Sequence, residues 1–242
     1  MAFTAQDVKA LREKTGVGMM ECKKALVEAD GDMDKAVDFL RERGLAAAAK
    51  KATRIAAEGV VLPYYDAEAK KGVVVEVNSE TDFVAKNEKF MSFVEGVAKT
   101  ILATNPADVE ALKEEKFDGT DRTVTETLND LVLSIGENMK VRRFERMDGV
   151  VSTYIHGGGS VGVMVGFDVA DESKAATAEF DAMGKNVAMQ IAAMSPAYLD
   201  EASVPTEVVE HEKTILAAQM KEDPKMASKP EAVLAKIAAG KM

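Results

Sequence analysis

The first 44 residues place apolar side chains at helical spacing, in three runs that are separated by glycines. Thr4 and Asp32 precede the first and third runs, and their side chains can cap a helix. A glycine typical of a helix end follows each run: Gly16, Gly31 and Gly44. The pattern therefore predicts three short helices packed as a miniature bundle, whose inward positions are Val8, Leu11, Met19, Cys22, Leu26, Ala29, Ala36, Val37 and Leu40.

Beyond the bundle the period of the apolar positions changes. Residues 45–57 are rich in alanine and lysine, which predicts a linking helix. Residues 59–65 and 72–78 are then short, largely apolar runs typical of strands, and they flank a polar stretch at 66–71. This arrangement predicts a β-hairpin, which is followed by a polar loop at 81–86.

Two amphipathic helices and a strand are expected next. The first helix carries Phe90, Phe93, Val94, Val97 and Ile101 on one side. Thr123 and Glu126 have the spacing of a capping box, so they predict the start of a second helix that ends at Gly136. Residues 140–146 are a predicted strand.

An internal repeat of 90 residues relates two parts of the chain. Residues 59–107 and 149–197 share 15 identities in 49 positions without a gap. The identities fall on glycines, valines and helix-face positions, as where Phe90 matches Phe180, so they are structural. The chain is therefore predicted to contain two copies of a hairpin-plus-helix unit.

The second copy departs from the first beyond residue 204. Residues 205–221 and 230–239 have the pattern of two helices, which residues 222–229 would join into a helical hairpin. The sequence reaches Met242 where the repeat predicts a strand equivalent to 140–146. The second copy is therefore expected to be incomplete, and the chain to be truncated at its C-terminus.

Together these elements predict an α+β fold. Its expected parts are a three-helix bundle (1–44), a linker helix (45–57), a first α+β subdomain (58–147), a second, incomplete subdomain (148–204) and a helical hairpin (205–242).

Composition narrows the classes of protein. The 242 residues carry a net charge of −10, which repels phosphate backbones, so no direct binding of nucleic acid is expected. Cys22 is the single cysteine, which excludes an internal disulfide and suits the reducing cytoplasm. The first residues lack the pattern of a signal peptide, and no apolar run approaches the ~20 residues that span a bilayer, so no membrane association is expected.

Phe83 is the most informative side chain, because it is a large apolar residue in the polar loop at 81–86. It either packs on its own subdomain or serves a partner protein. The repeat separates these interpretations, since the four positions from Thr81 to Val84 match the four from Asp171 to Lys174, which contain no aromatic residue. Because the second copy is expected to fold without an aromatic residue in this loop, the comparison favours a role for Phe83 in binding a partner protein.

Other candidate sites have simpler interpretations. Residues 157–162 fit the dinucleotide pattern G-x-G-x-x-G, but a strand at 161–169 is predicted where phosphate binding needs a helix N-terminus, which favours a flexible hairpin turn. His156 and His211 lie in different units without a cluster of ligands, so no metal site is expected. Cys22 is interpreted as a packed helix residue. Met19 and Met20 cannot both face inward, and an exposed methionine would suit a partner surface.

Two long motifs carry a family resemblance. The stretch Leu11-Arg-Glu-Lys-Thr-Gly-Val-Gly-Met-Met-Glu-Cys-Lys-Lys-Ala-Leu26 resembles the N-terminal signature of the bacterial translation elongation factor Ts family. The stretch Glu76-Val-Asn-Ser-Glu-Thr-Asp-Phe-Val-Ala-Lys86 resembles its second signature. Segments 136–143 and 154–157 resemble further parts of the family in the same order, so the similarity covers essentially the whole chain.

The resemblance implies a guanine-nucleotide exchange factor for elongation factor Tu, in its GDP-bound and nucleotide-free forms. It implies a ubiquitin-associated-like bundle, two related α+β subdomains and a coiled-coil hairpin. Residues 81–84 (Thr81, Asp82, Phe83 and Val84) would enter the nucleotide-binding domain of the partner, where Phe83 wedges between helices and Asp82 disturbs the Mg²⁺ site. Secondary contacts are implied for Arg12, Met19, Met20, Lys23, Lys51 and His156.

Exchange of this kind needs no catalytic acid, base or nucleophile, so the chain is predicted not to be an enzyme and to carry no cofactor. A homodimer and a heterotetramer with the partner stay open. Two alternatives compete with the exchange factor. A non-catalytic peptide-binding module would depend wholly on residues 1–44, and a nucleotide-dependent enzyme would need the glycine-rich turn to open a helix.

Overall fold

The computed structural model of the chain describes residues 3–223 and 229–240 and mixes helices with small antiparallel sheets, which confirms the α+β prediction. The chain divides into two compact units, Met1–Met194 and Ser195–Met242. Among the described residues, no helix has the length and apolar character needed to cross a membrane.

The N-terminal helices form around the predicted apolar stripes. They are α1 (Ala5–Thr15), α2 (Met19–Glu28) and α3 (Met33–Lys51). Thr4 caps α1 in a capping box with Asp7, and the Asp32 side chain accepts hydrogen bonds from the first amides of α3, so both predicted caps are confirmed. The buried cluster between the helices consists of Val8, Leu11, Val17, Cys22, Ala25, Leu26, Ala29, Ala36 and Leu40.

Three antiparallel strands follow, in the order β1-β2-β3: β1 (Glu58–Asp66), β2 (Lys71–Ser79) and β3 (Met139–Asp148). One face of this sheet packs on α5 (Glu88–Thr104), with α6 (Val109–Glu114) and α7 (Val124–Ile135) completing the core. The hairpin, the α5 face and the capping box of Thr123 and Glu126 are confirmed, whereas α6 was not predicted. At one end of the sheet, Glu58, Ser79 and Met139 lie side by side.

Two predictions about the bundle are wrong. Gly44 does not end the third helix, because α3 continues to Lys51 and residues 52–57 are not helical. A Cβ at Gly44 would lie 3.3 Å from the Asn129 carbonyl oxygen, so the glycine allows α3 to pack closely on α7. Met19 is not buried but 42% exposed, because Val17 and Cys22 fill the bundle interior at that level.

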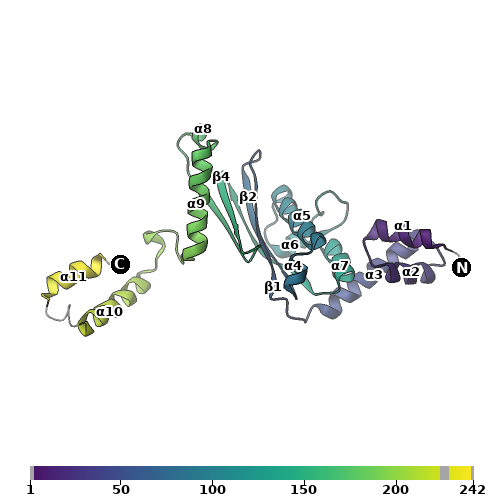
Figure 1. Cartoon of the computed structure of the whole chain (residues 1–242), viewed down its shortest axis with the longest axis horizontal. Coiled ribbons are helices and arrows are strands. Elements are labelled where there is room, and N and C mark those ends of the chain that lie inside the picture. The colour runs from purple at the N-terminus through teal and green to yellow at the C-terminus, as the bar shows by residue number, and fades with distance from the viewer. Residues whose placement is uncertain (1–2, 224–228, 241–242) are drawn as a thin grey trace. The chain divides into compact units, whose positions relative to one another are not determined.

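The second hairpin covers the other face of the first sheet. Its strands are β4 (Val150–His156) and β5 (Val161–Phe167), joined by the glycine-rich turn. On one face of β1, Val60 and Leu62 belong to the core beneath α5. Val61 points to the opposite face, where a Cβ at Gly162 of the second hairpin would lie 2.7 Å from its side chain. Helix α9 (Ala178–Met194) packs on the far side of β4 and β5, which gives the layer order helices, sheet, hairpin, helix (Figure 1).

The helices recur at the offset of the repeat. The short helix α4 (Asp82–Ala85) corresponds to α8 (Glu172–Ala175), and α5 corresponds to α9, each pair 90 residues apart. Phe90 of the first copy is fully buried, whereas its counterpart Phe180 is only half-buried. The same elements therefore form in both copies but bury their side chains to different depths.

The unit Ser195–Met242 contains a short 3-10 helix, η1 (Glu201–Ser203), followed by α10 (Thr206–Glu222) and α11 (Glu231–Ala239). The two helices expected at 205–221 and 230–239 are thus confirmed. Most of their predicted connection, at 224–228, and the last two residues of the chain lie outside the described residues.

Candidate functional site

Phe83 lies on α4, directly after β2, and 81% of the residue is exposed. The sequence predicted a loop at 81–86, but residues Asp82–Ala85 form a single turn of helix instead. The Lys86 amide closes this turn by donating to the Phe83 carbonyl at 3.3 Å. The aromatic ring is therefore presented to solvent from regular backbone.

The neighbour of Phe83 anchors the turn. Val84 is buried in the core with Phe90 and the β2 valines. Directly after the turn, Asn87 caps α5, and its side chain accepts hydrogen bonds from the amides of Lys89 and Phe90 at 2.9 and 3.4 Å. Because both flanks are fixed, packing holds the Phe83 backbone in place while the ring itself makes no core contact.

Glu137, between α7 and β3, clamps the start of the turn. Its two carboxylate oxygens accept from the Thr81 amide at 3.0 Å and from the Thr81 hydroxyl at 2.7 Å. The Thr81 carbonyl accepts in turn from Ser79 Oγ at 3.0 Å. Hydrogen bonds to a charged carboxylate are among the stronger ones in proteins, so this clamp limits the movement of Thr81.

A second set of bonds ties the same region to the segment after α3. Glu80 Oε1 accepts from the Asn138 amide at 2.5 Å, and it lies 3.6 Å from the Arg54 guanidinium. Asn138 Nδ2 donates to the Arg54 carbonyl at 2.8 Å. Residues 137–138 therefore connect the end of β2 with the chain that leaves the bundle.

Asp82 is the acidic side chain of the turn. Lys86 Nζ donates to Asp82 Oδ2 at 2.9 Å, one helical turn further along. This hydrogen bond, together with the positive charge of Lys86, holds the pKa of Asp82 below its ordinary value. The carboxylate is consequently ionised at neutral pH and is available to a cation or to a hydrogen-bond donor.

Glu76 supports the strand that leads to the turn. Burial alone would raise its pKa, but hydrogen bonds from Arg143, Asn78 and Arg142 outweigh that effect and hold the pKa below the ordinary value. The Arg143 and Arg142 bonds measure 2.7 and 2.9 Å. The polar side chains of the 76–86 motif thus fix the strand and the turn, while Phe83 alone among its apolar side chains stays exposed.

Sequence reasoning missed Glu137, Asn138 and Arg54 as parts of this site. The signal available was the segment 136–143, which resembled the family without an assigned role. Glu137 lies 56 residues from Thr81 in the sequence, and Asn138 lies 58 from Glu80, so only the pairing of β2 with β3 brings them together.

None of the candidate secondary contacts belongs to this turn or to its clamp. Arg12, Met19, Met20 and Lys23 are all exposed on the bundle, and Met20 is 65% exposed. Lys51 is half-buried at the last position of α3. His156 is exposed at the end of β4, where its Nδ1 lies 3.1 Å from the Tyr154 hydroxyl.

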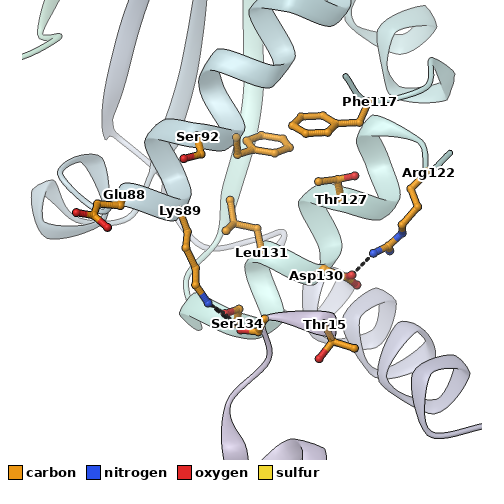
Figure 2. Close-up of a pocket in the computed structure, with 12 residues that line it drawn as sticks. Thr15, Glu88, Lys89, Ser92, Phe117, Arg122, Thr127, Asp130, Leu131 and Ser134 are labelled. Atoms are coloured by element: carbon orange, nitrogen blue, oxygen red, sulfur yellow. Dashed lines mark hydrogen bonds and ion pairs between the residues drawn. The ribbon is translucent and has the colours of Figure 1, made fainter. Parts of the chain in front are cut away.

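A pocket of about 490 Å³ lies where the bundle meets the helices of the core (Figure 2). The rings of Phe93 and Phe117, which stack at 5.5 Å, line it together with Leu131. Lys89 Nζ and Ser134 Oγ both donate to the Gly16 carbonyl, at 2.8 and 3.0 Å. These paired polar groups join the bundle to the helices behind Phe83, so the pocket belongs to a structural junction.

The glycine-rich turn at 157–160 packs against β1 through Gly159, while Gly157 and Gly158 are exposed. The Gly159 carbonyl accepts from the Val61 amide at 2.7 Å, and a Cβ at Gly159 would lie 3.0 Å from Val60. A strand follows the turn as predicted, so no helix N-terminus is present to hold a phosphate. Within residues 3–223 and 229–240, no cluster of His, Cys, Asp or Glu has the arrangement of a metal site.

Cys22 is buried, as predicted. Burial raises the pKa of its thiol, which keeps the sulfur protonated and unreactive at neutral pH.

The turn at 82–85 thus offers an exposed apolar side chain, Phe83, on a fixed backbone beside the ionised carboxylate of Asp82. Such an arrangement suits recognition of another macromolecule.

Comparison with known proteins finds similar sequences over nearly the whole chain. The sequence profile of the family described as Elongation factor TS matches residues 80–242. Elongation factor Ts of Clostridium perfringens (strain SM101) is 51% identical over 99% of this chain and 77% of the relative. The proteins of the same name from Syntrophotalea carbinolica and Clostridium novyi are 50% and 47% identical, over 100% and 99% of this chain and 78% and 77% of each relative.

Proposed function

The chain belongs to the elongation factor Ts family, and from that premise we propose that it is a guanine-nucleotide exchange factor for elongation factor Tu in translation. One observation carries the proposal most directly. Phe83 is exposed on a turn whose backbone is fixed by Val84, Glu137 and the cap of α5. Such a residue is prepared to enter another protein without reorganising its own.

In the proposed mechanism, Thr81, Asp82, Phe83 and Val84 act at the nucleotide-binding domain of elongation factor Tu. The Phe83 ring enters between helices of that domain, and Val84 holds the turn from inside this chain. The Asp82 carboxylate disturbs the surroundings of the partner's Mg²⁺, so that GDP loses its metal and phosphate contacts. Binding of GDP and binding of this chain to elongation factor Tu are then negatively coupled. Bound GDP must lower the affinity for this chain by the same factor by which this chain lowers the affinity for GDP.

The binding energy needed for exchange exceeds what one contact supplies. Lowering the affinity of elongation factor Tu for GDP about a thousandfold needs roughly 4 kcal/mol of differential binding. Burial of one phenylalanine supplies about 1.5–3 kcal/mol. Further contacts must therefore contribute, and we assign them to the candidate residues on the bundle, on α3 and on β4: Arg12, Met19, Met20, Lys23, Lys51 and His156.

In this proposal the chain binds and displaces, and it transfers no chemical group and carries no cofactor. We place it in the cytoplasm with its partner. The division into a bundle, a linker, two related subdomains and a C-terminal helical hairpin is likewise proposed, and the recurrence of the helices at the 90-residue offset supports it.

Stopped-flow release of fluorescent GDP from elongation factor Tu tests the proposal. We expect the chain to accelerate release, and Phe83→Ala to reduce the acceleration strongly while circular dichroism and the midpoint of thermal unfolding stay unchanged. A wild-type chain without effect on release would remove the proposed function. A Phe83→Ala chain that unfolds would assign Phe83 to the protein's own core.

The peptide-binding alternative is tested on the bundle. Because α3 runs unbroken across residue 44, a deletion there would cut a helix, and a surface substitution is the cleaner change. The exchange proposal expects Met20→Ala to weaken binding of elongation factor Tu only partly. Complete loss of binding by Met20→Ala, with Phe83→Ala still fully active, would favour the peptide-binding module.

A further inference from the structure

Ile55 is one of the most exposed large apolar side chains in the described part of the chain. Its exposed fraction is 85%, comparable with 81% for Phe83 and 93% for Leu199. Single exposed apolar residues are common on protein surfaces, so exposure alone carries no meaning. The meaning here comes from how the backbone around Ile55 is held and where it lies.

Both neighbours of Ile55 are fixed. The Arg54 carbonyl accepts from Asn138 Nδ2 at 2.8 Å, and the Arg54 guanidinium lies 3.6 Å from Glu80. Ala56, on the other side, is buried. Ile55 therefore projects from an anchored segment, in the way that Phe83 projects beside the buried Val84.

The two side chains lie at the same end of the first sheet. Residue 54 is bonded to Asn138, just before β3, and β1 begins at Glu58 on the opposite edge. Residues 54–58 must therefore cross the end of β2, from which Thr81 and Phe83 emerge. The turn at 137–138 joins the two segments directly, since Glu137 binds Thr81 and Asn138 binds Arg54.

The second hairpin adds apolar surface at this end. Its turn is bonded to β1 through the Gly159 carbonyl and the Val61 amide, close to the start of that strand. Ile155, next to the turn, is also exposed, and it lies on the hairpin face that covers β1, because it pairs with Gly162. The hairpin therefore brings an exposed apolar side chain to the same sheet.

We propose that Ile55 is a second apolar contact on the protein that receives Phe83, filling a shallow apolar depression beside the one that takes the ring. This inference rests on the proposed function, because the occupant is the same nucleotide-binding partner. A shared clamp fixes the spacing of the two side chains before binding, so little conformational freedom is lost on association.

The two contacts should differ in kinetics. Phe83 acts where GDP is displaced, so its loss lowers the maximal rate of GDP release. Ile55 adds binding that is the same before and after displacement, so its loss raises the half-saturating concentration of the factor. We expect Ile55→Ala to raise that concentration about tenfold with little change in the maximal rate, as expected for one aliphatic side chain.

Leu199→Ala is the matched control, because Leu199 is equally exposed but lies in the other compact unit. It should leave both kinetic parameters unchanged. Ile55→Asp, which places a charge in the proposed depression, should weaken binding further than Ile55→Ala. Since Ile55 makes no core contact, both variants should unfold at the wild-type temperature.

A fluorescent probe tests the location directly. Cys22 is buried, so an environment-sensitive dye on Ile55→Cys labels one position. Nucleotide-free elongation factor Tu should shift its emission to the blue. An emission maximum that does not move, one already shifted in the free chain, or wild-type kinetics for both Ile55 variants would overturn this inference while leaving the exchange function intact. A wild-type chain that does not accelerate GDP release from elongation factor Tu would overturn both this inference and the proposed exchange function.

Discussion

The turn after the first hairpin exposes Phe83 to solvent, whereas in the corresponding turn after the second hairpin Ser173 is hydrogen-bonded to Asp171, the N-cap residue of α8. Ser173 Oγ donates to Asp171 Oδ1 at 2.6 Å, and the Ser173 amide donates to the same atom at 3.1 Å. Glu172, which corresponds to Asp82, accepts from Lys70 at 2.8 Å. Both turns thus use their polar groups within the chain, and only the first turn leaves an aromatic ring in solvent.

The difference extends to the residues that hold each turn. Val84 is buried under the first turn, while the matching Lys174 of the second is exposed. An outward phenylalanine therefore came with an inward valine next to it. The comparison shows that the exposed ring of the first turn is backed by a buried neighbour, which the second turn lacks.

The helices behind the turns differ in the same sense. Nine residues of α5 are buried, whereas only Gly184 and Ala188 of α9 are. Copy one can support a fixed projection because α5 packs beneath α7 as well as on the sheet. Copy two offers less core on which a projection could rest.

The largest effect is expected from the paired phenylalanines of the two copies. Phe90→Ala removes a fully buried ring and should lower the free energy of unfolding by about 3–5 kcal/mol. Phe180→Ala removes a half-buried ring that contacts Phe167 edge to face, and it should cost about 1–2 kcal/mol. Urea unfolding monitored by circular dichroism measures both, and equal losses would contradict the difference in depth.

A residue exchange between the copies tests the anchor. Phe83→Ser gives the first turn the residue of the second and should reduce the acceleration of GDP release at least thirtyfold. Ser173→Phe, added to Phe83→Ser, should restore nothing, because Lys174 supplies no buried anchor. Recovery of exchange in the double variant would show that the ring alone is sufficient, and stopped-flow release measures both proteins.

Sequence patterns predicted the parts of this site better than its assembly. The caps of α1, α3 and α7 followed from local pairs such as Thr123 and Glu126, because a cap depends on residues three positions apart. Gly44 misled the prediction, since glycine at a helix end and glycine at a close helix crossing look alike in sequence. Only the packed structure tells them apart.

The site shows the same limit. Phe83 stood out because the repeat supplied a second copy without it. Glu137 and Arg54 did not stand out, because their roles depend on bonds to residues far away in the sequence. No local pattern distinguishes a clamping glutamate from a solvated one, so contact with Thr81 had to be seen in three dimensions.

A smaller effect is expected from loosening the clamp. Glu137→Ala leaves the Thr81 amide and hydroxyl without acceptors and should lower the maximal rate of GDP release about fivefold, because the turn samples more positions. Glu137→Gln keeps one acceptor oxygen for the Thr81 amide, and its NH2 group can donate to the Thr81 hydroxyl, so it should recover most of the rate. Combining Glu137→Ala with Thr81→Val should cost less than the sum of the two changes, as stopped-flow kinetics would show. Additive losses would mean that the two residues act separately.

The smallest effect concerns charge, and it again separates the two turns. Lys86 holds the pKa of Asp82 down, so the pair stabilises the turn above the ordinary pKa of aspartate and loses its effect as the pH falls through the lowered value. Copy two has Ala176 at the position of Lys86 and engages its acid through Lys70 instead. Lys86→Met should therefore raise the pKa of Asp82 in a carboxyl NMR titration, whereas Lys70→Met should leave it unchanged. A shift caused by Lys70→Met would mean that the charges of the two turns are coupled, and that the second copy helps to set the ionisation of the first.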